Sequence, residues 1–133
     1  MYAAPQDRQK EGSTKDHKDM CGAINMMTWA KHDGLTGEHG AMWDIVKSDE
    51  ADQVSNFLRD KLELTDRSPD PLHDQRTFLD DATLEDLYLQ VGVVPFRVVQ
   101  KPGDMILIPP GAPHQVCILG SSRIVALIGL ITA

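Results

Sequence analysis

Two short apolar runs stand out in the first third of the chain, INMMTWA (24–30) and AMWDIV (41–46). The stretch between them, HDGLTGEHG, is rich in glycine and polar residues. A run of this length bounded by such breakers is typical of a buried strand, whereas a helix would need a longer periodic pattern. Both runs are therefore predicted to be strands joined by a loop.

The spacing of apolar residues becomes helical between residues 49 and 64. Apolar side chains recur there three or four positions apart, at Val54, Phe57, Leu58 and Leu62. Ser48 is the expected N-cap, and Asp49 and Glu50 fall in the first turn, where the helix dipole favours negative charge. The pattern predicts a helix over 49–64 and a turn-rich connection over 66–75.

A second helix is predicted over residues 84–91. Its apolar face consists of Leu84, Leu87, Tyr88 and Val91. Thr83 and Asp86 have the spacing of a capping box, and Gly92 is the expected terminator. The two helices would form one insertion between the early and the late strands.

From residue 95 onward the chain consists of strand-like runs separated by turn residues. The runs are PFRVVQ (95–100), MILIP (105–109), HQVCIL (114–119) and RIVALIGLI (123–131). Short strands at this spacing favour an antiparallel sandwich or barrel. The pattern therefore predicts a mainly β domain with a two-helix insertion.

Length and charge narrow the functional classes. At 133 residues the chain is long enough for one domain, which we assign to residues 13–133 after a flexible lead-in over 1–12. Twenty acidic against 13 basic residues give a formal charge of -7, which argues against direct nucleic-acid binding and suits a basic partner. The most apolar segment, residues 123–133, is too short for a membrane-spanning helix, so no membrane association is expected.

Three residues are candidates for holding a metal ion. His17 and Asp19 are two positions apart, and in an extended strand such residues point to the same side. His114 follows the rigid turn IPPGAP and opens an apolar strand. Two histidines and one carboxylate leave open coordination positions and suit ferrous iron. The residues alone leave a second interpretation open, because a lone histidine opening an apolar strand is more often structural than a ligand.

Four segments, in order along the chain, carry a resemblance to a known family. They are STKDHKDMCGAINMMTWA (13–30), AMWDIVKSDEADQVSNFLRDKL (41–62), DPLHDQRTFLDDATLEDLYLQVGV (70–93) and VVQKPGDMILIPPGAPHQVCIL (98–119). The sequence resembles JmjC domains, and among them the histone lysine demethylases that act on mono- and dimethylated lysine of histone H3. In that branch the first of these segments delivers a histidine and an aspartate to iron, and the last delivers the distal histidine.

The resemblance implies a double-stranded β-helix, which is a cupin-like jelly roll, and we expect it to be incomplete at its N-terminus. It also implies that Fe(II) is held by His17, Asp19 and His114, with 2-oxoglutarate as cosubstrate and O2 in the remaining position. The residues that it assigns to 2-oxoglutarate are Lys31, Thr14 and Asn25.

The activity implied by the resemblance is oxidative N-demethylation of methyl-lysine on the histone H3 tail, in the nucleus. Such an oxidoreductase would be a chromatin regulator. One alternative is an inactive JmjC remnant that serves as a chromatin-associated interaction module. Another is a generic metal-binding cupin with a small-molecule substrate, but simple cupins connect their strands by loops shorter than the helical insertion expected here.

Overall fold

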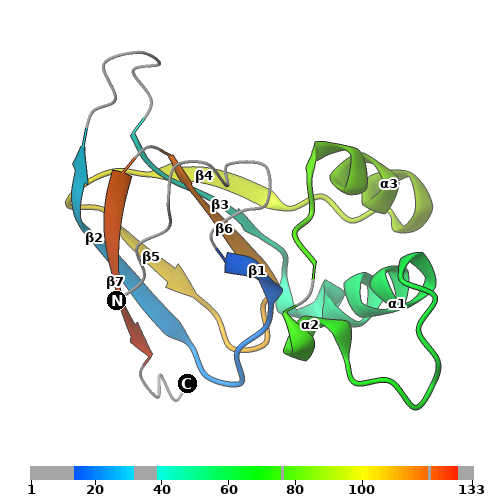
Figure 1. The fold of residues 1–133 in the computed structure, drawn as a ribbon. Coiled ribbons are helices and arrows are strands. Elements are labelled where there is room, and N and C mark those ends of the chain that lie inside the picture. Colours follow the sequence, from blue (N-terminus) through cyan, green and yellow to red (C-terminus); the bar gives the residue numbers. More distant parts are fainter. Residues whose placement is uncertain (1–13, 32–38, 76, 120, 129–133) are drawn as a thin grey trace.

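The computed structural model describes residues 14–31, 39–75, 77–119 and 121–128 (Figure 1). Its strands form two sheets, and every described pair of neighbouring strands is antiparallel. The four-stranded sheet has the order β1 (Thr14–His17), β6 (His114–Leu119), β3 (Gly40–Ile45), β4 (Phe96–Gln100). The three-stranded sheet has the order β5 (Met105–Ile108), β2 (Ala23–Lys31), β7 (Ser121–Ile128).

The strand predictions are confirmed for the described residues. The runs predicted at 24–30 and 41–46 are β2 and β3, and the later runs are β4 to β7, with bounds that differ by a few residues. The mainly β class, with helices inserted between β3 and β4, is therefore confirmed. The lead-in predicted over 1–12 and the last residues of the final run, 129–131, lie outside the described residues.

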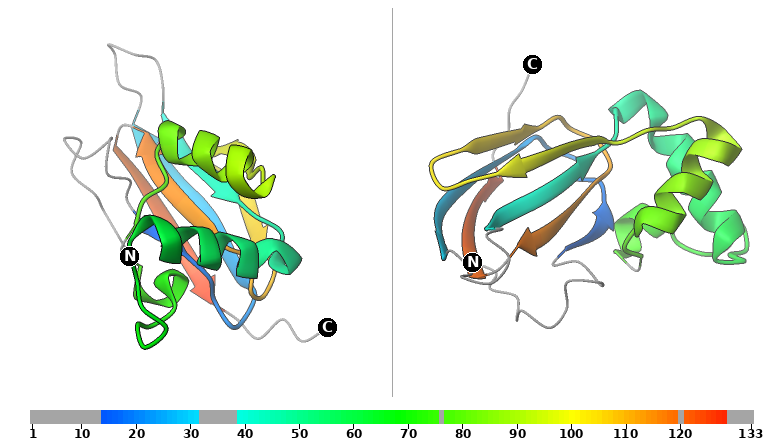
Figure 2. Two further views of the ribbon diagram at one scale, coloured as in Figure 1. Left: turned by 90° about the vertical axis from the view of Figure 1, so that its right-hand side faces the viewer. Right: turned by 90° about the horizontal axis from the view of Figure 1, so that it is seen from above.

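Helical segments connect β3 to β4. They are a 3-10 turn (Ser48–Glu50), α1 (Ala51–Lys61), α2 (Pro71–Asp74) and α3 (Asp81–Val91). The helices lie together at one end of the strand layers, as two views show (Figures 1 and 2). None of the described helices has the length and the apolar character that a membrane span requires.

The first predicted helix and the connection after it need correction. Ser48 lies inside the 3-10 turn, and Glu50, which precedes α1, makes no side-chain cap hydrogen bond, so the predicted N-cap is wrong. The helix ends at Lys61 rather than at 64. The connection predicted over 66–75 contains α2, because the Asp70 side chain accepts a hydrogen bond from the N–H of Leu72 and starts a short helix. The insertion thus has three α-helices rather than two.

The start of α3 was also predicted wrongly. The Asp80 carboxylate accepts a hydrogen bond of 2.9 Å from the N–H of Thr83, so Asp80 is the N-cap and Thr83 lies within the first turn. The helix ends at Gly92, as predicted, with a φ of 73° that suits glycine. Its apolar face is narrower than predicted, since Tyr88 is 56% and Val91 is 37% exposed.

Two separate apolar cores support this arrangement. The first lies between the two sheets and consists of Ala23, Met27, Ala41, Trp43, Ile108, Ala112, Val116 and Ile118. The second lies among the helices and consists of Val46, Val54, Phe57, Leu58, Leu72, Leu79, Leu87 and Val93. β6 contacts both cores, because its Val116 and Ile118 belong to the first core and its Gln115 binds the backbone of Leu79 in the second.

Gly40 provides a test of the packing of β3 against β4. Its φ is +125°, and a Cβ atom there would overlap the carbonyl oxygen of Gln100. Gly40→Ala should therefore lower the free energy of unfolding by about 2–4 kcal/mol, from backbone strain plus the clash. The matched control is Gly103→Ala, since Gly103 also has a positive φ of +92° but has no atom within 4 Å of the added Cβ. Urea denaturation should show a loss of about 1 kcal/mol for the control, and equal losses would contradict the clash.

Candidate metal centre

The pairing of β1 with β6 brings together two histidines that are 97 positions apart in the chain (114 − 17). His17 lies opposite His114 in the antiparallel register, and Thr14 lies opposite Val116, with an irregularity between the two pairs. Residues that face each other across an antiparallel pair carry their side chains on the same side of the sheet. The two imidazole centroids are accordingly 4.1 Å apart, with 51° between the ring planes.

Asp19 joins the two histidines from outside the strand. Because β1 ends at His17, the two residues do not share one extended strand, as their spacing had suggested. The backbone carbonyl of Asp19 instead accepts a hydrogen bond of 2.7 Å from the N–H of Gly111, in the turn that precedes His114. One ligand atom from each of the three side chains lies within 4.8 Å of the others. The structure thus gathers all three predicted residues, and it does so through a turn.

Backbone carbonyls orient both imidazoles. The Nδ1–H of His17 donates to the carbonyl of Lys15 at 2.8 Å, and the Nδ1–H of His114 donates to the carbonyl of Ala112 at 2.9 Å. A carbonyl can only accept, so each neutral ring carries its proton on Nδ1 and presents the Nε2 lone pair. Histidines that bind metals commonly use this arrangement, with one ring nitrogen on the metal and the other held by a backbone acceptor.

Burial favours the neutral form of His114. The residue is 3% exposed, and this desolvation lowers the pKa of its imidazole. The neighbouring His17 lowers the pKa further, whereas the carbonyl of Ala112 and the charge of Asp19 act in the opposite direction. The ring also stacks on the indole of Trp43, at 6.3 Å and 29°. A neutral, fixed imidazole is the form that binds a metal ion.

The donor set fits a divalent first-row metal ion. Two ligands of one ion lie at most about 4.4 Å apart, which is twice a metal–ligand distance of about 2.2 Å. The three candidate ligand atoms all lie within 4.8 Å of one another, so small rotations of the partly exposed His17 and Asp19 side chains suffice to bring them onto one ion. Two imidazoles and one carboxylate leave the remaining coordination positions open, as in centres that bind a cosubstrate and oxygen.

The residues predicted to contact 2-oxoglutarate lie on strands beside this cluster. Thr14 is opposite Val116, a residue of the core between the sheets, so its side chain faces the same interior. Asn25 is on β2 and is 6% exposed. Lys31 is the last residue of β2, and its backbone pairs with Ser121. Their contact with 2-oxoglutarate stays a prediction.

A buried amide that the sequence reasoning missed supports the wall beside His114. The indole N–H of Trp43 donates to Oε1 of Gln100 at 2.9 Å. The Gln100 amide nitrogen donates to the carbonyls of Asn25 and Asp104, at 2.8 and 3.0 Å. Gln100 is 0% exposed, so its amide lies at the buried centre of this network. The available signal was a glutamine that closes an apolar run, FRVVQ, beside a turn.

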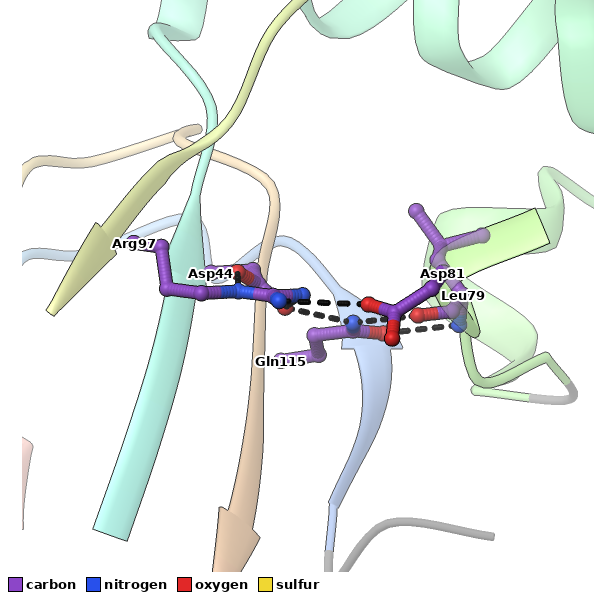
Figure 3. A network of polar contacts seen from close by, with 5 residues as sticks. All are labelled: Asp44, Leu79, Asp81, Arg97 and Gln115. Atoms are coloured by element: carbon purple, nitrogen blue, oxygen red, sulfur yellow. Dashed lines mark hydrogen bonds and ion pairs between the residues drawn. The ribbon is translucent and has the colours of Figure 1, made fainter. Parts of the chain in front are cut away.

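A second polar network joins β3, β4 and β6 to the start of α3 (Figure 3). The Arg97 guanidinium forms a bidentate ion pair with Asp44, at 2.7 and 3.1 Å, and reaches Asp81 at the start of α3 at 3.1 Å. The Gln115 amide nitrogen donates to Asp44 at 3.0 Å and to the carbonyl of Leu79 at 2.8 Å. Its oxygen accepts from the N–H of Leu79 at 2.8 Å. Because side chains alternate along a strand, Gln115 points away from the histidine side.

Asp16 is the other buried acid on that face. Burial and, to a smaller extent, the charge of Asp44 raise the pKa of its carboxyl to about 7, although the hydrogen bond from the N–H of His17 acts in the opposite direction. Among the described residues, its Oδ2 has no hydrogen-bond partner. The carboxyl points away from the three candidate ligands, because Asp16 and His17 are adjacent in β1.

The two sheets and the cluster of two histidines and one carboxylate define a mainly β domain with a candidate metal site. The chain belongs to the JmjC domain family, because the family model described as "JmjC domain, hydroxylase" matches residues 14–126. That match includes all three residues of the cluster.

Individual relatives extend the comparison. The chain is similar to Lysine-specific demethylase 3A of Rattus norvegicus, with 31% identity over an alignment of 144 residues. The alignment covers 84% of this chain and 12% of the relative. It is also similar to Lysine-specific demethylase 3 of Drosophila melanogaster, with 42% identity over 81 residues, 58% of this chain and 10% of the relative. Lysine-specific demethylase JMJ26 of Arabidopsis thaliana is 33% identical over 96 residues, 66% of this chain and 11% of the relative. The chain thus spans between 10% and 12% of these relatives.

The cluster predicts the behaviour of histidine variants toward a metal ion. His114→Ala should weaken binding of Co(II), a spectroscopic probe for such sites, by more than roughly 100-fold, since losing a ligand exceeds the effect of losing an outer hydrogen-bond partner. Titration of the visible Co(II) absorption under nitrogen measures this. His73→Ala is the control, because His73 is exposed on α2. Binding by His114→Ala equal to that of the control would contradict the assignment of His114.

The network in Figure 3 predicts unequal effects of its two ion pairs. Arg97→Met leaves the Asp44 carboxylate, whose side chain is 5% exposed, without its cation. The expected loss is about 2 kcal/mol, below the roughly 3–5 kcal/mol typical of a broken buried pair, because the Arg97 side chain is 41% exposed. Asp81→Asn removes a partner that is 89% exposed and should cost less than about 0.5 kcal/mol. Urea unfolding of both variants checks this, and a larger loss for Asp81→Asn would overturn it.

Proposed function

We propose that this chain is a domain of an Fe(II)- and 2-oxoglutarate-dependent dioxygenase that removes methyl groups from lysine of the histone H3 tail by oxidative N-demethylation. The observation that carries the proposal is the cluster of His17, Asp19 and His114 within the segment that matches the JmjC family. The names of the relatives, which are lysine-specific demethylases, support the reaction. The proposal includes a JmjC-like domain over 13–133, a double-stranded β-helix built from the two sheets, and a nuclear location.

Each cluster residue has a defined part in holding the metal. The Nε2 atoms of His17 and His114 and a carboxylate oxygen of Asp19 would hold Fe(II), with the Nδ1 protons anchored on backbone carbonyls. When bound, the iron with 2-oxoglutarate supplies oxidation of a C–H bond by O2. The Trp43 ring packs beside His114 and limits its rotation. The protein's contribution is thus to fix three donors and to keep the opposite positions open.

The cosubstrate needs donors of a different kind. A carboxylate in an enclosed site is bound by a cation and by hydrogen-bond donors. Lys31 would supply the cation, and Thr14 and Asn25 would supply a hydroxyl and an amide from strands that face the interior. The excess of acidic residues gives the chain a formal charge of -7, which favours a basic substrate such as the histone H3 tail.

Ligand binding and turnover test the proposal separately. The chain with Fe(II) and 2-oxoglutarate under nitrogen should develop the weak visible charge-transfer band of the chelate. Admission of O2 with a mono- or dimethylated H3 peptide should then yield succinate and formaldehyde in equal amounts. His114→Ala should remove the band and both products.

The two readouts separate the competing functions. A band without formaldehyde from the H3 peptide would contradict the substrate and leave the oxygenase chemistry in place. The absence of both the band and succinate, in a folded chain, would contradict the enzyme and favour the alternative of a chromatin-associated interaction module.

A further inference from the structure

The residues that adjoin the candidate ligands in sequence make polar contacts with one short part of the helical insertion. This part, here called the supporting segment, consists of residues 70–75 and 77–79. Lys18 contacts Asp70, Asp16 contacts Thr77 and Gln115 contacts Leu79, in the order of the segment. These neighbours flank His17, precede Asp19 and follow His114, so all three candidate ligands are held next to the same segment.

Lys18 lies between two of the candidate ligands and is fixed by Asp70. Its Nζ is 2.8 Å from Oδ2 of Asp70, and the two side chains are 16% and 23% exposed. Asp70 itself is held in place, because its Oδ1 accepts from the Oγ of Ser55 at 2.9 Å and from the N–H of Leu72 at 3.0 Å. Burial alone would raise the pKa of the Asp70 carboxyl, but the hydrogen bonds from Lys18, Leu72 and Ser55 lower it below its ordinary value. Asp70 is therefore a charged and oriented partner for Lys18.

This ion pair matters because the turn that carries Asp19 has little regular structure. β1 ends at His17, so the backbone from Lys18 to Asp19 lies outside the strand ladder. The backbone bond from Gly111 to the carbonyl of Asp19 holds one end of this turn, and the ion pair of Lys18 holds the other. Together they restrict the direction in which the carboxylate of Asp19 points.

The other two contacts hold the strands. The N–H of Asp16 donates to the carbonyl of Thr77 at 2.9 Å, on the outer edge of β1. The Gln115 side chain, 1% exposed, binds both backbone groups of Leu79 at 2.8 Å. The segment therefore contacts β1 along its outer edge and β6 on the face opposite His114, at the position where the register of the two strands sets the distance between the two rings.

From these contacts we propose that the supporting segment positions the metal ligands, with Lys18 and Gln115 as the positioning residues. The inference rests on the proposed function, in that it requires the cluster to bind a metal ion. Neither residue touches the metal, so both act through the backbone that carries His17, Asp19 and His114. If the same contacts served only to stabilise the fold, their loss would lower the melting temperature without a specific effect on the metal site.

Variants at the two residues distinguish these possibilities. Lys18→Met keeps the aliphatic stem and removes the ion pair, and Gln115→Leu removes the three amide hydrogen bonds. Each should weaken Co(II) binding by roughly 10-fold, the lower end of the range for outer partners of metal ligands, and should change the position or shape of the visible Co(II) bands. Lys18→Arg retains the cation and should restore both the affinity and the spectrum. Leu87→Val, in the helical core, is the control for a general loss of stability.

Amide hydrogen exchange of the metal-free proteins gives a second readout. Each variant is measured at the same number of degrees below its own melting temperature. Under that condition the amides of residues 14–19 should exchange faster in Lys18→Met than in Leu87→Val. If Gln115→Leu does not fold, Lys18→Met carries the test alone, since its side chain is not fully buried.

The outcomes separate this inference from the proposed function. Wild-type Co(II) affinity and spectrum in a folded Lys18→Met variant would overturn the inference and leave the metal site intact. Failure of the unmodified chain to bind Co(II) would overturn the proposed function, and the positioning of metal ligands with it. Weaker binding in Leu87→Val equal to that in Lys18→Met would also overturn the inference, because the effect would then follow stability alone.

Discussion

The register of β1 against β6 is the constraint on which the candidate site depends. It sets His17 opposite His114 and brings their rings to 4.1 Å. A shift of one residue would turn every side chain of β1 to the other face, and His17 would exchange places with Asp16, which is buried on the side of Asp44. Because β1 has only four residues, the ladder alone specifies this register weakly, and the contacts outside the ladder gain importance.

Those outside contacts join the two apolar cores. Trp43 belongs to the core between the sheets and stacks on His114, and Leu79 belongs to the helical core and binds Gln115. His114 is therefore held by the core between the sheets through the ring of Trp43. It is held by the helical core through the amide of its neighbour, Gln115. A candidate site at the junction of two cores can be rigid although it stands at the edge of a sheet.

The sequence allowed the elements and the candidate ligands to be predicted, but not the contacts that place them. Short apolar runs reveal strands because a strand buried between layers needs few residues, and helical spacing located α1 and α3. The caps were missed because Asp80 and Thr83 are both good capping residues within one turn, and only the tertiary path selects between them. His17 and Asp19 were chosen for strand spacing, yet a turn unites them with His114. The partners of Gln100, Gln115 and Lys18 are distant in sequence, so no local pattern reveals them.

The separation of the helical core from the sheets has a consequence for the order of folding. All the residues of the helical core lie between Val46 and Val93, so their contacts close short loops, whereas the pairing of His17 with His114 must join distant parts of the chain. Since closing a longer loop costs more entropy and non-local contacts form more slowly, we expect the helices to assemble first and the ends of the chain to meet on them. The end of the domain that carries the candidate metal site would then be the last part to become native, with the helical insertion as the template on which it forms.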